Sequence, residues 1–262
     1  MDEMGSLKKV KYLILGGGLS GLGAAKALLD EDHLLLEKNN NLLGHANSVS
    51  FMNHSFDFGT HICHSKDNNW LKRINKEDCN FFKDSIVKNY DKGRWVDYPV
   101  QNNLRHLPKD KAKLALKELE GLQSSMPNND NYLEWSRSVY GSFLTENYYK
   151  RFTDKYWRTD MVEMSTDWFS GRILPTNIQI IKDGFKEKPK SQAVFKSFFY
   201  PKKSGFSNLF KYFHEKVNYE VGKNIININP DNKIVYTDDG FEYKYEILIN
   251  TLPLNQMPHL IS

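Results

Sequence analysis

The stretch VKYLILGGGLSGLGAA, residues 10–25, decides the fold of this chain. It joins a short apolar run to glycines in the spacing G-x-G-x-x-G, and small and apolar residues at helical spacing follow. A second apolar run, residues 33–36, ends at Glu37, about twenty residues after the glycines. A strand, a glycine turn, a helix, a second strand and an acid in this order predict a dinucleotide-binding site.

Each glycine of the pattern has a separate task. Gly16 permits the tight turn, Gly18 lets a pyrophosphate approach the backbone, and Gly21 lets helix and strand pack closely. The free N–H groups at the start of the helix would then bind the diphosphate. This adds Leu19 and Ser20 to the predicted cofactor-binding residues.

The acid at the end of the second strand supplies the other half of the prediction. The carboxylate of Glu37 would accept hydrogen bonds from the ribose hydroxyls of an adenosine. The pattern indicates a dinucleotide and does not distinguish NAD from FAD. An ordinary glycine turn without a ligand is the alternative interpretation of the same residues.

Length and composition limit the class of protein. With 262 residues the chain has room for one large domain or two small ones. A hydrophobic content of 40% is enough for a packed core, and an aromatic content of 13% argues against disorder. The net charge of +4 is small and basic residues are scattered among acids, which argues against nucleic acid as a partner.

The sequence also carries signals about the compartment. Two cysteines, Cys63 and Cys79, form no CxxC pair and fit a reducing compartment. Residues 1–9 are polar and lack the apolar core of a signal peptide. No apolar run of the sequence approaches the length of a membrane span. We therefore expect a cytoplasmic protein without a membrane span.

Beyond the glycines, two segments make the chain resemble a known superfamily. These are residues 44–48 (G-H-A-N-S) and residues 57–61 (D-F-G-T-H). Together with the E-K after the second strand, they resemble FAD-dependent amine oxidase-like flavoproteins, which include protoporphyrinogen oxidases and UDP-galactopyranose mutases. The resemblance implies FAD as the cofactor. One departure is visible, because Leu43 stands where the superfamily has a glycine.

The resemblance also implies which residues contact FAD. The segment 44–48 would run beside the diphosphate and the ribityl chain, and the segment 59–61 would lie near the isoalloxazine ring. To the glycine turn and Glu37, the prediction thus adds Lys38, Gly44, His45, Ser48, Gly59, Thr60 and His61.

Two further segments resemble the UDP-galactopyranose mutase branch. Residues 59–64 are similar to its G-P-H-I-F-H, and residues 155–172 to its K-x-W…W-x-x-x-R, whose arginine contacts the substrate diphosphate. His61, on the flavin side, and Arg172, whose planar guanidinium suits phosphate oxygens, are therefore the predicted catalytic residues. The alternatives are a helix start at which one of His61 and His64 is the cap and the other is exposed, and an Arg172 in a helix-end salt bridge. No third ligand stands at metal spacing, so no metal site is predicted.

The expected fold class is α/β. A Rossmann-like FAD-binding domain (1–75) would carry an inserted α+β substrate domain (76–205) and resume at 206–262, and the resemblance implies that it is truncated at the C-terminus. Periodicity predicts hairpins at 49–58 and 81–98, helices at 109–122, 132–157 (broken near Gly141) and 207–217, a strand at 177–181, a meander at 224–243 and a separate parallel strand at 247–253.

Three functions fit these features. The first is a flavoenzyme, an oxidoreductase or a mutase-like isomerase, acting on a small substrate such as a nucleotide sugar. The second is a truncated or split flavoprotein half without independent catalysis, completed by a second polypeptide or by self-association. The third is an NAD(P)-dependent dehydrogenase, which the glycine pattern permits and the segments after it argue against.

Overall fold

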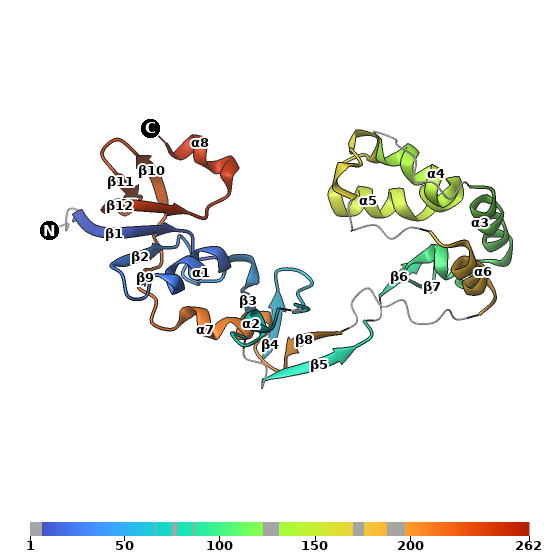
Figure 1. Cartoon of the computed structure of the whole chain (residues 1–262), viewed down its shortest axis with the longest axis horizontal. Coiled ribbons are helices and arrows are strands. Elements are labelled where there is room, and N and C mark those ends of the chain that lie inside the picture. The colour runs from blue at the N-terminus through green and yellow to red at the C-terminus, as the bar shows by residue number, and fades with distance from the viewer. Residues whose placement is uncertain are drawn as a thin grey trace. The chain divides into compact units, whose positions relative to one another are not determined.

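The computed structural model describes residues 7–65, 67–74, 78–85, 87–122, 131–169, 176–187 and 197–261. The chain divides into two compact units, which Figure 1 shows with their elements labelled. The first unit comprises Met1–Lys83 and Ser197–Ser262, and the second comprises Asp84–Lys196. The division into domains after residues 75 and 205 stays a prediction.

A six-stranded sheet organises the first unit. Its order is β10-β11-β12-β1-β2-β9, so that β1 lies in the interior of the sheet. β1 pairs in parallel with both β12 and β2, and β2 pairs in parallel with β9. The strands are β1 (Leu7–Leu15), β2 (His33–Leu36), β9 (Tyr219–Glu220), β10 (Ile225–Asn229), β11 (Ile234–Thr237) and β12 (Glu242–Asn250).

The interior position of β1 follows from its apolar run, because a parallel strand is covered on both faces. Leu13 and Leu15 belong to one buried cluster, with Tyr243 of β12. Ile14 points to the opposite face and belongs to a second cluster, with Leu22 of helix α1 (Leu19–Ala27). The alternation along β1 therefore separates two cores, one on each side of the sheet.

The end of the meander differs from the prediction. The expected third meander strand and the expected separate strand at 247–253 are one strand, β12, which pairs with β1 from Leu7↔Glu242 to Leu15↔Asn250. Within this strand Lys244 and Glu246 are exposed, and the alternating residues Tyr243 and Tyr245 are buried. Lys244 and Glu246 are the outward positions of a continuous strand.

Smaller elements complete the first unit. β3 (Ser48–Phe51) and β4 (His54–Asp57) form the predicted hairpin. β5 (Cys79–Lys83) pairs with β8 (Ser197–Pro201), so the prediction that residues 81–89 form a hairpin with residues 94–98 is only partly right. The predicted helix at 207–217 is shorter, a 3-10 turn at Phe206–Phe210 followed by α7 (Lys211–His214). Two four-residue helices, α2 (Asn68–Leu71) and α8 (Met257–Leu260), also belong here.

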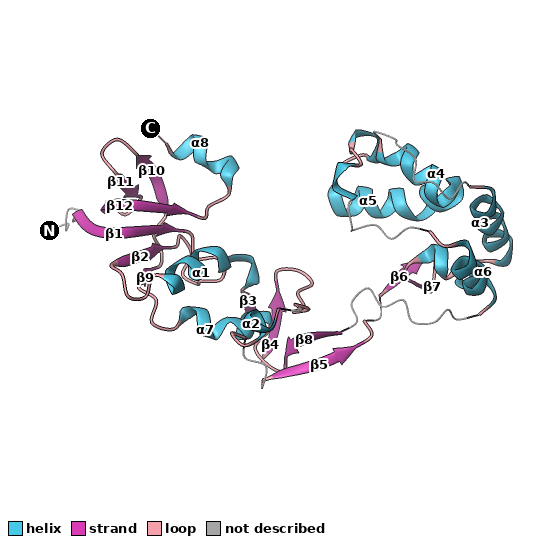
Figure 2. Ribbon diagram, viewed as in Figure 1, coloured by secondary structure: helices cyan, strands magenta, loops and turns pink. Residues whose placement is uncertain are grey.

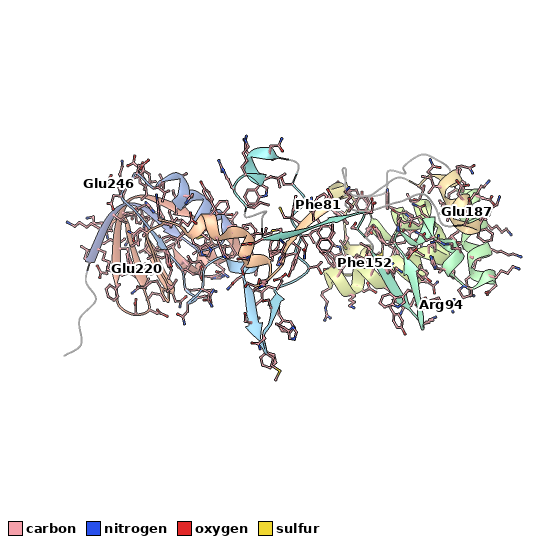
Figure 3. All side chains as sticks on the ribbon, turned by 90° about the horizontal axis from the view of Figure 1, so that it is seen from below. Phe81, Arg94, Phe152, Glu187, Glu220 and Glu246 are labelled. Atoms are coloured by element: carbon pink, nitrogen blue, oxygen red, sulfur yellow. The ribbon has the colours of Figure 1, made fainter. Side chains whose placement is uncertain are left out.

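One long-range contact ties the edge strand β9 to the interior of the sheet. Glu220, labelled in Figure 3, accepts hydrogen bonds from Nζ of Lys8 at 2.7 Å and from the hydroxyl of Tyr243 at 2.8 Å. These partners come from β1 and β12. These two hydrogen bonds join β9 to β1 and β12, which lie far from it in the sequence or in the sheet.

The second unit is mainly helical, as Figure 2 shows. A hairpin of β6 (Lys88–Asp91) and β7 (Arg94–Asp97) accompanies α3 (Lys109–Gly121), α4 (Tyr132–Leu144), α5 (Lys150–Trp157) and α6 (Ile178–Lys186). The prediction of a strand at 177–181 is wrong. Asn177 caps α6 by accepting hydrogen bonds from the N–H groups of Gln179 and Ile180, and the buried Ile181 belongs to the unit's core.

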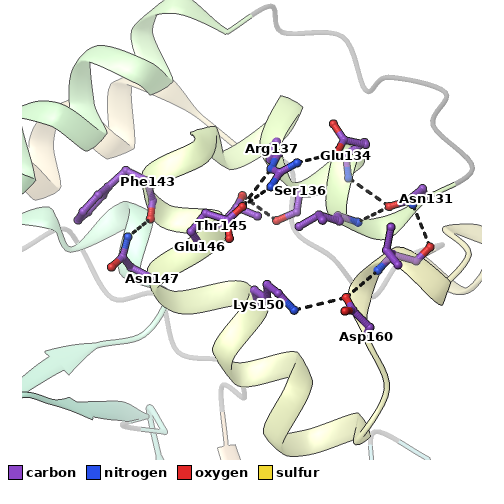
Figure 4. A network of polar contacts seen from close by, with 12 residues as sticks. Asn131, Glu134, Ser136, Arg137, Phe143, Thr145, Glu146, Asn147, Lys150 and Asp160 are labelled. Carbon is purple, nitrogen blue, oxygen red and sulfur yellow. Dashed lines mark hydrogen bonds and ion pairs between the residues drawn. The ribbon is translucent and has the colours of Figure 1, made fainter.

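The predicted break in the helices at 132–157 is confirmed at Gly141, whose φ is +77°. Beyond it, residues Thr145–Tyr149 form a π-helix that leads into α5. Figure 4 shows the side chains that hold the two halves together. Arg137 pairs with both Glu134 and Glu146, and the buried hydroxyls of Ser136 and Thr145 lie 3.0 Å apart.

Candidate functional site

The glycine turn lies between β1 and α1. Gly16 has a φ of +99°, and its N–H donates to the carbonyl of Leu36 at 2.9 Å. The hydroxyl of Thr251 donates to the carbonyl of Leu15 at 2.7 Å. A Cβ on Gly16 would lie only 2.9 Å from the hydroxyl oxygen of Thr251. The turn is therefore fixed by residues at the ends of both neighbouring strands, as the sequence predicts for a bend after a central strand.

The other two pattern glycines meet different surroundings. A Cβ on Gly21 would lie 1.9 Å from the carbonyl oxygen of Gly16, so only glycine permits this approach of helix to turn. A Cβ on Gly18 would meet no atom of the other described residues within 4 Å, at a φ of −70° that any residue adopts. Gly18 thus borders open space, where a ligand can approach the backbone.

The first turn of α1 is available to an anion. In the described part of the chain no side chain forms a cap hydrogen bond to α1, and its first turn contains no acidic residue. Leu19 and Ser20 begin the helix, and Ser20 is exposed. Unpaired N–H groups and the positive end of the helix dipole favour a negatively charged group at such a position.

Glu37 is buried directly beside the turn. One carboxylate oxygen accepts from the N–H of Gly17 at 2.7 Å, and the other accepts from the N–H and the side-chain amide of Asn39 at 2.8 Å each. A carboxylate has further lone pairs, so ribose hydroxyls could still donate to it. That contact stays a prediction, as does the contact of the exposed Lys38.

The segment that follows reaches back to the turn. The N–H of Leu43 donates to the carbonyl of Gly17 at 2.7 Å, and a Cβ on Gly44 would lie 3.4 Å from Cα of Gly18. Leu43 has a φ of +81° and is buried. It therefore holds the left-handed conformation that a glycine would adopt without strain, at the position where the resemblance led us to expect a glycine.

Two other residues predicted to contact the cofactor lie in the same loop. His45 is exposed in a 3-10 turn at Gly44–Ala46. The hydroxyl of Ser48 donates to Asp57 at 2.7 Å and accepts from the N–H of Ser207 at 3.1 Å. The Ser48 hydroxyl thus has protein partners of its own.

Asp57 links the end of β4 to the segment from Tyr200 to Phe206 through hydrogen bonds. It accepts hydrogen bonds from the hydroxyl of Tyr200 at 2.6 Å and from the N–H of Phe206 at 3.0 Å. Burial opposes ionisation, but the hydrogen bonds from Tyr200, Phe206 and Ser48 hold the pKa of Asp57 below its ordinary value. Burial and the hydrogen bond to Asp57 raise the pKa of Tyr200 to about 12.

His61 lies against the segment from Tyr200 to Phe206. Its ring stacks on that of Phe206, with ring centres 4.9 Å apart and an angle of 16° between the planes. Its Nδ1 atom is buried and has no hydrogen-bond partner in the described part of the chain. Gly59 and Thr60 before it are exposed. The alternative in which His61 caps a helix does not fit, because the next helix, α2, is capped by Asp67.

Arg172 lies outside the described residues. Among the residues that the structure describes, no group of three His, Cys, Asp or Glu side chains could hold a metal ion. Sequence reasoning gave no role to Asp57, Asn39 or Thr251, although Asp57 belongs to the segment 57–61 that carried the resemblance.

The fold and the turn define an α/β protein with a Rossmann-like unit. The family described as an NAD(P)-binding Rossmann-like domain matches residues 14–77. This range spans the turn, Glu37 and the segment that contains His61.

Solved structures share the fold over nearly the whole chain. A reduced UDP-galactopyranose mutase is 24% identical with a TM-score of 0.83, covering 97% of this chain and 57% of its own. A protein assigned as protoporphyrinogen oxidase from Exiguobacterium sp. 255-15 is 19% identical with a TM-score of 0.65, covering 98% and 62%. A redesigned putrescine oxidase is 11% identical with a TM-score of 0.58, covering 97% and 60%.

These comparisons support the α/β fold with a Rossmann-like unit, which the sequence predicts. The chain spans about 57 to 62% of the length of these solved chains. In the described ranges, each helix is too short or too polar to cross a lipid bilayer.

Proposed function

We propose that the chain binds FAD and belongs to a flavoenzyme that acts on a small substrate. The observation that carries this proposal is the open space at Gly18, bordered by the uncapped start of α1 and by the segment at Leu43 and Gly44. A diphosphate can approach the backbone there without meeting a side chain. The three solved structures above are named as a mutase and two oxidases, which supports flavin-type chemistry in the whole protein.

The residues present fit such a cofactor. Gly18 and the first turn of α1 would hold the diphosphate, and Glu37 would accept from the adenosine ribose while it fixes Gly17. His61 would lie on the flavin side, where its unpartnered Nδ1 would find a hydrogen-bond partner. Arg172 would hold an anionic substrate such as a nucleotide-sugar diphosphate.

FAD, when bound, supplies the redox or nucleophilic chemistry at its ring, and the protein supplies binding and orientation. In this chain the stacked ring of Phe206 sets the plane of His61, and Asp57 fixes Phe206 through its N–H. The His61 ring is therefore packed against a fixed neighbour before a ligand arrives.

A second candidate is an NAD(P)-dependent dehydrogenase. The observation in its favour is the name of the matched family, an NAD(P)-binding Rossmann-like domain. The same turn and the same acid would hold the adenosine diphosphate half of either cofactor. The two candidates differ in what lies beyond the diphosphate, at the segment 59–61.

A third candidate is a flavoprotein half that needs a second polypeptide, or another copy of the chain, for turnover. Under this candidate FAD would bind but the isolated chain would not turn over. Activity restored only by mixing with a partner would separate it from the first candidate.

The test is a cofactor-binding measurement on the purified full chain. We expect flavin absorbance to stay with the protein after FAD addition and desalting, and NADH to be washed off. In Gly18→Leu the new side chain fills the open space without strain, so FAD affinity should fall about 100-fold, equivalent to about 2.7 kcal/mol.

The matched control is Gly23→Ala, in the same helix and also facing nothing within 4 Å, which should keep wild-type affinity. Retention of NADH in place of FAD would favour the second candidate. Equal FAD affinity of Gly18→Leu and wild type would contradict the proposed site.

A further inference from the structure

The carboxylate of Glu37 has little acceptor capacity left, and this limits how it can recognise a ribose. Its Oε2 atom accepts the N–H of Gly17 at 2.7 Å, and its Oε1 atom accepts both the N–H and the side-chain amide of Asn39 at 2.8 Å each. A carboxylate offers about four lone-pair positions, two on each oxygen. Among the described residues, these donors fill both positions of Oε1 and one of Oε2. One position, on Oε2, is left for a ligand.

The backbone fixes Asn39 where it makes these contacts. Its carbonyl accepts the N–H of Gly222 at 3.2 Å, in the loop that follows β9. The same segment holds the backbone of Glu37, whose N–H donates to the carbonyl of Glu220 at 3.0 Å and whose carbonyl accepts the N–H of Lys223 at 2.9 Å. Glu37 and Asn39 are therefore preorganised by neighbours from a distant part of the sequence.

The donors to Glu37 differ in what a substitution can remove. Two are backbone N–H groups, of Gly17 and of Asn39, which stay in place whatever the side chain. The other is the side-chain amide of the exposed Asn39, which reaches the buried carboxylate. Truncation of this side chain therefore opens one acceptor position on Oε1 and leaves the charge of the site unchanged.

We propose that Asn39 is a positioning residue that restricts Glu37 to one hydroxyl of a bound ribose. The inference rests on the proposed function, because the ribose is that of the adenosine diphosphate half of the cofactor. One hydroxyl donates to the open position on Oε2, where a hydrogen bond to a charged acceptor is strong. The second hydroxyl finds Oε1 occupied by Asn39 and gains no hydrogen bond from Glu37. The chain should therefore distinguish between the two hydroxyls of one ribose.

The experiment measures the affinity of the purified full chain for ADP, 2′-deoxy-ADP and 3′-deoxy-ADP by isothermal titration calorimetry. The probes share the base and the diphosphate and differ in one hydroxyl. In the wild type, one analogue should bind at least about 10-fold more weakly than ADP, since it lacks a hydrogen bond to a charged group, and the other should stay within about 3-fold. In Asn39→Ala the opened position on Oε1 accepts the second hydroxyl, so both analogues should bind at least about 10-fold more weakly than ADP.

The ratios between the probes separate this role from a purely structural one. A less ordered loop in Asn39→Ala lowers the affinity for all probes alike, and their ratios then stay as in the wild type. The matched control is Asn41→Ala, which truncates an exposed asparagine of the same loop. In the described part of the chain Asn41 donates no hydrogen bond to Glu37, so this variant should keep the wild-type ratios.

The remaining outcomes overturn the inference. Equal affinities of the wild type for the two analogues would show that Glu37 does not distinguish the hydroxyls. Wild-type ratios in Asn39→Ala would show that Asn39 does not set the preference. Either result together with ADP binding contradicts the role of Asn39 alone and leaves the proposed function standing. A wild type that does not bind ADP even at millimolar concentration would contradict the proposed cofactor site as well.

Discussion

Two places in the molecule are built from the same parts, the turn between β1 and α1 and the kink in α4. Each contains a glycine with a positive φ, Gly16 at +99° and Gly141 at +77°. Each has a glutamate that accepts a backbone N–H, Glu37 from Gly17 at 2.7 Å and Glu118 from Phe143 at 2.8 Å.

The two places differ in the space beside the glycines. A Cβ on Gly18 would meet nothing within 4 Å, whereas a Cβ on Gly141 would lie 2.6 Å from the carboxylate of Glu118. In the first unit Glu37 accepts the N–H of Gly17 and leaves the space beside Gly18 open. In the second unit the glutamate fills the break itself. The glycines and the acid leave space beside the backbone at the start of α1 and not at the kink of α4.

The largest expected effect separates the packing glycine of the turn from its neighbour in the helix. Gly21→Ala should destabilise the first unit by about 4 kcal/mol or more, because its Cβ would overlap the carbonyl oxygen of Gly16. Gly23→Ala should stabilise it by up to about 1 kcal/mol, since alanine is the better helix former. Urea denaturation followed by circular dichroism measures both, and similar midpoints for the two variants would refute the close approach.

The next effect tests whether the glutamate of the kink is structural. Glu118→Ala should cost the second unit about 1–3 kcal/mol, because the N–H of Phe143 loses its acceptor. The control Glu120→Ala removes an exposed partner of Lys182 and should stay within about 0.5 kcal/mol of wild type. FAD affinity should not change in either variant. A lower FAD affinity in Glu118→Ala would contradict a purely structural role of Glu118.

A smaller effect concerns backbone strain beside the turn. Leu43→Ala and Leu43→Gly both remove a buried side chain and should cost about 2–5 kcal/mol. Glycine, however, adopts the φ of +81° freely, so Leu43→Gly should be the more stable of the two by about 1 kcal/mol. This order reverses the usual preference for alanine, and the usual order in thermal unfolding would contradict the left-handed conformation.

The smallest effect is a dependence on pH. Asp57 is a third carboxylate beside a glycine of positive φ, Gly205 at +71°, and its hydrogen bonds lower its pKa from the ordinary 3.8. A lowered folded-state pKa adds stability above the unfolded pKa, and that stability is lost as pH falls through the folded value.

The stability difference between wild type and Asp57→Asn should therefore be constant above about pH 5 and shrink below it. Urea midpoints measured from neutral pH into the acid range would follow it. A difference that grows toward acid pH would reverse the sign and contradict the hydrogen bonds.

The sequence predicts local features of this fold well. The turn, α1 and β2 follow from an apolar run, glycines and a second apolar run within residues 10–37, and the hairpin of β3 and β4 follows from alternation. It fails where pairing is distant. β5 pairs with β8, more than 100 residues later, and the residues of the two strands do not indicate this pairing. The helix α6 was missed because isoleucines at 178, 180 and 181 suggested a strand, while the cap at Asn177 decides otherwise.

For the candidate site the limit is of the same kind. The pattern predicts that Glu37 lies at the turn, and the structure brings them together. The residues that fix the turn and His61 from outside, Thr251 and Asp57, have ordinary side chains whose partners are set only by the tertiary fold. The direct contacts to a cofactor stay predictions, and those of Arg172 lie outside the described residues.

The hydrogen bond from Thr251 to Leu15 joins residues 236 positions apart in the sequence. A ribosome that adds about 5–20 residues per second needs roughly 10 to 50 s to make the intervening polypeptide. During that interval β1 has emerged without β12, its longest partner, and its leucines are uncovered. We therefore expect nascent chains of this protein to engage chaperones that shield apolar segments, until the last strand of the sheet has been translated.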